Sequence, residues 1–231
     1  MKKISFILLS LGLFSSVFTQ EATTPKGPWE KGIISTATFS QTTLSNWAAG
    51  GQNAISMNLY GKLFANYKKD KNSWENSLEL AYGLLRQDKS APVKSDDKID
   101  FITKYSRQLN NDKLFFSTFI NFRSQLANGF AYPEAGGTDL ISQFAAPAYL
   151  FITVGLEYKP VDFFSIYFSP LTNKNTWVTA HDNIDETSYG LDAGSTWRFE
   201  GCSYLKLHFK KELFKNVNVE SKADFFANYA E

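Results

Sequence analysis

The side chains best suited to chemistry are few and far apart in this sequence. Its two histidines are His181 and His208, and its single cysteine is Cys202. A transition-metal site needs several ligands at defined spacing, and these three residues do not supply one. The sequence therefore predicts no metal site, and each histidine is expected to be solvated or packed among polar groups.

Two acidic segments contain residue types found in active sites or cation sites. Residues 180–192, AHDNIDETSYGLD, hold His, Asp and Ser, and residues 132–139, YPEAGGTD, offer Glu134 and Asp139 to a calcium ion. The first segment does not bring a base, a nucleophile and an orienting group together. The second specifies too few oxygen ligands. Both are predicted to be solvated outer loops.

Motif and composition searches point away from catalysis and from nucleic acid. The nucleophile elbow, the P-loop and the HExxH helix are all absent from the sequence. We therefore predict a protein that is not an enzyme, with no catalytic residue and no cofactor. The 231 residues include 24 basic and 23 acidic side chains, so no excess of positive charge predicts a nucleic-acid partner. No Pro-, Gly- or Ser-rich linker divides the chain, which indicates one domain.

The N-terminus has the features of a secretory signal peptide. In residues 1–20, Lys2 and Lys3 follow Met1, an apolar run comes next, and small and polar residues end the segment. The alternative, a membrane anchor, is disfavoured because the run is shorter than the roughly 20 apolar residues of a spanning helix. We predict a signal peptide at 1–20, an N-terminal extension at 21–31 and a β-barrel domain at 32–231. Cys202 has no partner for an internal disulfide.

Apolar and polar side chains alternate along most of the remaining chain. From Ile55 to Tyr67 the odd positions are mostly apolar and the even positions mostly polar, which is the period of a strand with two different faces. The same pattern predicts an all-β, antiparallel protein with nine strands: 32–44, 54–68, 73–87, 96–109, 113–127, 148–159, 163–171, 203–211 and 217–229.

The connections and the two faces favour an up-and-down transmembrane β-barrel over a soluble sandwich. Short links at 69–72, 110–112, 159–163 and 212–216 alternate with longer loops at 45–53, 88–95, 128–147 and 172–202, as in outer-membrane barrels. Aromatic residues of the apolar face flank the short links and are expected to form an interfacial girdle: Tyr67, Trp74, Tyr105, Phe116 and Tyr158. Charges of both signs occupy the other face, as expected of a watery or salt-bridged lumen: Lys62, Glu75, Glu79, Lys98, Asp100, Lys104, Arg123, Glu157, Lys206, Lys210, Glu220, Lys222 and Asp224.

Several phrases resemble an uncharacterised outer-membrane β-barrel family of Bacteroidetes, a domain of unknown function. They include SNWAAGG, KSDDKIDF, APAYLFITVGLEYKP and FFSIYFSPLTNK, and the resemblance runs from about Trp29 to Tyr229. It implies an outer-membrane barrel of about twelve strands and no particular reaction. Because this sequence stops at FFANYAE, we expect an incomplete barrel with a gap or a strained seam between the strands near Ile33 and Val217.

The segment SNWAAGG is expected to be a loop between the first two strands. Gly50 and Gly51 permit a positive φ or a close approach of the backbone. Trp47 is expected to pack into the barrel mouth or lie at the outer interface or, alternatively, to serve as a ligand platform or a docking point for a partner. Three functions remain open: a pore or transport channel, a structural or partner-binding barrel with a plugged lumen, and a soluble periplasmic lipid-binding barrel. The expected partners are outer-membrane lipid, the barrel-assembly machinery and a small polar solute in the lumen.

Overall fold

The computed structural model describes residues 27–45, 50–88, 90–132, 137–179, 184–215 and 217–230. The predicted signal peptide at 1–20 lies outside these residues, and so do Trp47, Glu134 and His181. Within them no helix is long and apolar enough to cross a membrane.

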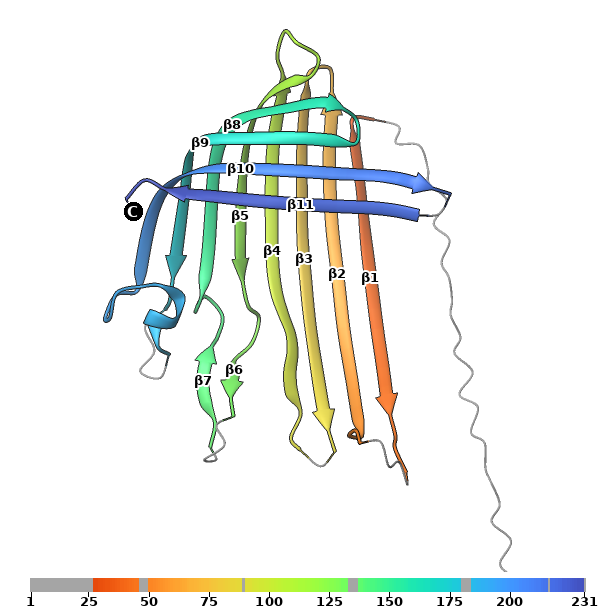
Figure 1. Ribbon diagram of the computed structural model, residues 1–231, viewed down its shortest axis with the longest axis vertical. Coiled ribbons are helices and arrows are strands. Elements are labelled where there is room, and N and C mark those ends of the chain that lie inside the picture. The colour runs from red at the N-terminus through yellow and green to blue at the C-terminus, as the bar shows by residue number, and fades with distance from the viewer. Residues whose placement is uncertain are drawn as a thin grey trace, which may run out of the picture.

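Nine antiparallel strands form one sheet, in which each strand pairs with its neighbours along the chain in the order β1-β2-β3-β4-β5-β8-β9-β10-β11 (Figure 1). The predicted all-β, up-and-down architecture and the number of sheet strands are therefore confirmed. The strands are β1 (Trp29–Thr42), β2 (Ala54–Lys69), β3 (Asn72–Gln87), β4 (Val93–Gln108), β5 (Leu114–Ser124), β8 (Ala148–Val161), β9 (Phe164–Trp177), β10 (Trp197–Phe214) and β11 (Val217–Asn228).

Among the described residues, three elements lie outside this sheet, in the long connections. The strands β6 (Gly129–Ala131) and β7 (Asp139–Ser142) pair as a small hairpin, and η1 (Glu186–Tyr189) is a single turn of 3-10 helix. Residues 128–147, predicted to be one long loop, therefore contain a short hairpin. Its short apolar pairs, such as Phe130 opposite Leu140, are too brief to produce a visible alternation.

The largest error in the predicted boundaries concerns β9 and β10. Residues 172–202 were expected to be a loop, but β9 continues to Trp177 and β10 already begins at Trp197. A bulge hides the pattern, because β9 advances from Ser169 to Thr172 while β10 advances only from Cys202 to Tyr204. The extra residue moves the inward positions from odd to even numbers, so the alternation breaks in the middle of the strand.

The bulge also requires close packing of two backbones. A Cβ atom on Gly155 of β8 would lie 2.1 Å from the carbonyl oxygen of Phe168. Only glycine fits at this position without a shift of one strand. The register of β8 against β9 changes at the same point, between Val154 and Leu156.

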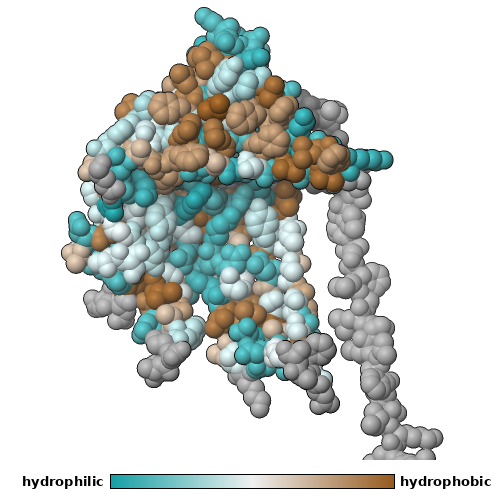
Figure 2. Space-filling view, viewed as in Figure 1, coloured by the Kyte–Doolittle hydropathy of each residue, from teal (hydrophilic) through white to brown (hydrophobic). Residues whose placement is uncertain are grey.

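The sheet has the two faces that the alternation predicted. On the outer, convex face of β2, Ile55, Met57, Leu59 and Leu63 remain exposed, Met57 by 50%. The inner, concave face carries the charged residues, which pair across neighbouring strands, for example Lys62 with Glu79 at 3.0 Å. In Figure 2 apolar residues gather over the strands in front, and a polar area appears below them.

Aromatic side chains line up across the first four strands near the short turns. Trp29, Tyr67, Trp74 and Tyr105 are direct partners in register from β1 to β4. The rings of Trp29 lie 5.1 Å from Tyr67 and 5.9 Å from Trp74. Of the five predicted residues, Tyr67, Trp74 and Tyr105 lie in this row, and Trp29 is a member that the sequence pattern did not reveal. Phe116 and Tyr158 lie outside the row, because Phe116 is opposite Arg107 and Leu156, and Tyr158 is opposite Leu114.

The short connections lie at one end of the sheet, and the long ones lie at the other end together with the short connection 88–92. Links at 70–71, 109–113, 162–163 and 215–216 join strands at the end with the aromatic row. Connections at 43–53, 125–147 and 178–196 are much longer, whereas 88–92 is no longer than 109–113. Gly50 and Gly51 have φ values of 83° and 123°, which confirms the positive φ predicted for the first long loop.

The sheet curls strongly but does not close among the described residues. In Figure 1 the strands β8 to β11 pass in front of β1 to β5, and no pairing joins β1 to β11. Both strands are therefore edges of the sheet. Closure between the strands near Ile33 and Val217 is therefore not found among the described residues, and an incomplete barrel stays a prediction.

Candidate functional site

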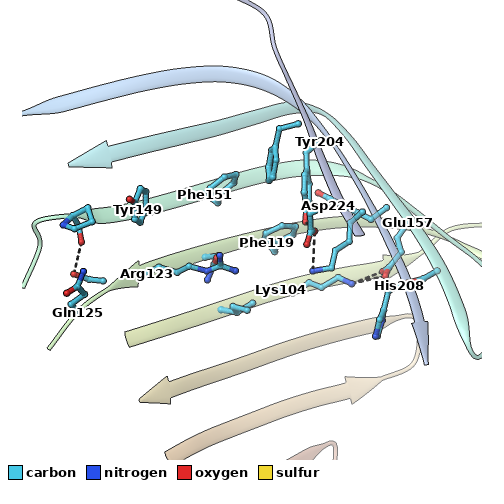
Figure 3. Close-up of a pocket in the computed structure, with 18 residues that line it drawn as sticks. Lys104, Phe119, Arg123, Gln125, Tyr149, Phe151, Glu157, Tyr204, His208 and Asp224 are labelled. Atoms are coloured by element: carbon cyan, nitrogen blue, oxygen red, sulfur yellow. Dashed lines mark hydrogen bonds and ion pairs between the residues drawn. The ribbon is translucent and has the colours of Figure 1, made fainter. Parts of the chain in front are cut away.

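The concave side of the sheet contains a cavity of about 580 Å³, which is the best candidate for a site. Its walls come from β4, β5 and β8 to β11, so its residues are brought together by the curl of the sheet (Figure 3). This volume is within the range of small-molecule sites. The lining combines aromatic rings with charged side chains.

Aromatic residues from five strands converge in the cavity. Tyr204 of β10 stacks on Phe226 of β11 with ring centroids 4.8 Å apart, and Phe226 also meets Phe151 of β8 at 5.3 Å. On the opposite side, Phe119 of β5 lies 5.6 Å from Tyr167 of β9 and 5.9 Å from Tyr204. These rings form a largely apolar wall inside an otherwise polar face.

Sequence reasoning assigned charges to the lumen but missed these inner aromatic residues. Their positions in the alternation could have revealed them. Phe119 has an odd number like Asn121 and Arg123, and Phe151 has an odd number like Glu157, so each lies on the same face as those polar residues.

Glu157 is the most enclosed carboxylate of the site, with 5% of its side chain exposed. Lys104 of β4 donates to both of its oxygens at 2.9 Å, and Lys159 approaches at 3.3 Å. The hydroxyl of Ser117 adds a contact at 3.4 Å. This arrangement ties β4, β5 and β8 together, because leaving such a carboxylate without partners would be costly.

A second carboxylate, Asp224 of β11, accepts a hydrogen bond from a tyrosine. The Tyr204 hydroxyl donates to Asp224, while Lys206 stays 3.8 Å from the same oxygen. Across the cavity, Arg123 contacts Asp100 through Nε at 3.4 Å. Figure 3 shows Arg123 between the aromatic residues and Gln125.

Of the two histidines, only His208 lies in the part of the chain that the structure describes. His208 lies on the inner face of β10 and contacts Glu220 at 3.0 Å, as expected of a histidine packed in the lumen. His181 lies outside the described residues. Cys202 is buried and free, so its sulfur is not exposed for reaction.

The inner face beyond the cavity carries further ion pairs. The carboxylate of Glu79 on β3 forms ion pairs with the ammonium groups of Lys62 on β2, at 3.0 Å, and of Lys98 on β4, at 2.7 Å. The carboxylate is 23% exposed. The predicted mixture of charges in the lumen is therefore arranged as bridges between adjacent strands.

At the opposite end from the aromatic row, one buried aspartate fixes a long connection. Asp97 is 3% exposed and accepts the backbone N–H groups of Leu126 and Ala127 at 2.6 and 3.0 Å. Lys94 donates to Asp97 at 2.6 Å and to the Ala127 carbonyl at 2.8 Å. This network fixes the start of the 125–147 connection against β4.

Parts of the 125–147 and 178–196 connections pack together as an apolar cluster. Ala146, Val178, Ile184 and Leu191 bury one another, and the Tyr189 hydroxyl donates to the Ile141 carbonyl. Asp185 caps η1, and hydrogen bonds from Thr187 and Ser188 hold the pKa of its carboxyl below its usual value. These contacts give residues 184–191 a structural role.

The segments considered for catalysis or calcium show no metal-binding cluster in the part of the chain that the structure covers. There, no three His, Cys, Asp or Glu side chains converge. Asp139 begins β7, whereas Glu134 lies outside the described residues. The absence of an enzyme activity stays a prediction.

Comparisons with known proteins return one relationship. Neither the curated proteins nor the solved structures searched contain a match. One family model does match, over residues 39–130, from within β1 to the β6 strand, and its description is "Protein of unknown function (DUF3078)". The resemblance to a domain of unknown function is thereby supported for this part of the chain.

Proposed function

We propose that this protein is an outer-membrane β-barrel whose polar inner face lines a passage for small polar solutes. The observation that carries the proposal is the difference between the two faces of one continuous sheet. Large apolar residues cover the outer face, and ion pairs cover the inner face. Monomers in water rarely expose a continuous apolar surface of this extent.

The aromatic row supports the membrane part of the proposal. Amphipathic rings favour the boundary between hydrocarbon and water. Trp74 donates to Thr103 at 2.8 Å and Tyr105 to Asn72 at 2.7 Å, so the polar ends of both rings are satisfied. The row would then lie at the periplasmic interface, where barrels have their short turns.

A fractionation experiment tests the location. The full chain, expressed in a Gram-negative host, is expected to sediment with the outer membrane and to require detergent for extraction. Recovery as a soluble periplasmic protein would refute the membrane proposal and favour the lipid-binding barrel.

Conductance tests the passage. In planar bilayers the purified chain should produce discrete current steps, and Lys98→Glu should shift the ion selectivity toward cations because it reverses a charge of the inner face. Lys211→Glu is the matched control, since Lys211 lies opposite Val219 in an outer-face position. Equal shifts in both variants would mean that the inner face does not line the path.

A second function, a barrel with a plugged lumen, is favoured by the ion pairs of Lys104 and Lys159 with the enclosed carboxylate of Glu157. A structural role predicts membrane location without current steps. The same conductance experiment therefore separates the two functions.

A further inference from the structure

Two cations of the concave cavity form no hydrogen bond among the described residues. The nearest carboxylate to the Arg123 guanidinium is Asp100, 3.4 Å from Nε, and the nearest to the Lys206 ammonium is Asp224, at 3.8 Å. Both separations are too long for the charge-assisted hydrogen bonds that such groups usually make. Their donors are available to a ligand.

The other charged groups of the cavity are already occupied. Glu157 is held by Lys104 and Lys159, and Asp224 accepts the Tyr204 hydroxyl. The lining holds three Lys or Arg side chains and two carboxylates, apart from His208. Lys206 also lies close enough to Lys104 and Arg123 to interact with their charges. An anion placed among these groups would relieve the repulsion.

The walls around the two cations are aromatic. Phe119, Tyr149, Phe151, Tyr204 and Phe226 all line the same cavity. Aromatic side chains that line a cavity offer apolar surface to a flat apolar body. A fully hydrated inorganic anion would leave this surface unused.

We propose that the cavity binds an aromatic carboxylate, with Arg123 and Lys206 holding the carboxylate and the rings holding the body. Arginine suits this role because its planar guanidinium presents paired donors to a carboxylate. The inference rests on the proposed function, since it names the class of solute that enters from the passage. It adds a selective step to a path that would otherwise discriminate by size and charge alone.

The test measures binding of 2-naphthoate and of its neutral analogue 2-naphthamide to the full chain in lipid nanodiscs, by equilibrium dialysis with empty nanodiscs subtracted. Naphthoate is expected to bind at least about tenfold more tightly, because only the acid makes charge-assisted hydrogen bonds. Arg123→Gln and Lys206→Gln should each remove most of this preference. Lys210→Gln, on the same strand as Lys206 but outside the cavity, should preserve it.

Three results would overturn the inference. Equal binding of the acid and the amide by the unaltered chain would remove the anion site, whatever the variants do. An equal loss in Lys210→Gln would reduce the effect to overall charge. If dodecanoate bound more tightly than naphthoate, the preferred ligand would carry an acyl chain instead of an aromatic body. The carboxylate would then come from a lipid.

Failure of this inference is distinguishable from failure of the proposed function. Naphthoate selectivity without conductance would uphold the binding site and refute the passage. Conductance with equal binding of both probes would uphold the passage and refute the site.

Discussion

Glu157 and Glu79 differ mainly in burial, which makes them a natural pair for measuring what the interior of this sheet contributes to stability. Each carboxylate bridges two lysines, Lys104 and Lys159 in one case and Lys62 and Lys98 in the other. Their exposed fractions are 5% and 23%. We predict that Glu157→Gln destabilises the fold far more than Glu79→Gln does.

The expected magnitudes follow from the two environments. Removing one partner of a buried ion pair typically costs about 3–5 kcal/mol, because the other charge is left uncompensated. Lys104 keeps 21% of its side chain exposed, so the lower end, about 3 kcal/mol, is expected for Glu157→Gln. Exposed pairs contribute about 0.2–1 kcal/mol each. Glu79→Gln should therefore cost about 1 kcal/mol.

Equilibrium unfolding in urea, followed by tryptophan fluorescence in the same lipid or detergent, provides the measurement. The double variant Lys104→Met with Glu157→Gln should recover part of the loss, since it also removes the uncompensated ammonium. If the two single variants differ by less than about 0.5 kcal/mol, the interior is as well solvated as the exposed bridge. The argument from burial would then be refuted.

Three further changes test the faces, the bulge and the loop. Leu80→Arg on the outer face should make the free energy of folding into liposomes less favourable by about 2–4 kcal/mol. If Leu80→Arg and Glu79→Gln had equal effects on this free energy, the two faces would be misassigned. Gly155→Ala should lower the unfolding midpoint markedly, because its Cβ would meet a backbone oxygen at 2.1 Å; an unchanged midpoint would contradict the tight approach. Asp97→Asn should accelerate proteolysis within 125–147, since its two backbone donors and a lysine lose a charged acceptor, and unaltered cleavage rates would show that the loop is fixed by other contacts.

Local periodicity was sufficient to predict the strands and their faces. Alternation from Ile55 to Tyr67 identifies β2 and its outer side, because each residue of a strand reverses the direction of its side chain. The same rule placed Glu79 and Glu157 on the inner face, and the turns placed the aromatic residues at one end. None of these conclusions needs knowledge of a distant contact.

The bulge in β9 and the cavity could not be predicted from local periodicity and became clear only from the tertiary structure. The bulge at Ser169–Thr172 reverses the inward parity within β9, so the strand's second half looked like loop until its pairing with β10 was known. The cavity depends on the curl of the sheet, which brings Phe119 of β5 to within 5.9 Å of Tyr204 of β10. Residues 85 positions apart (204 − 119) have no local signal of such a meeting, because curvature accumulates over many strands rather than residing in any one of them.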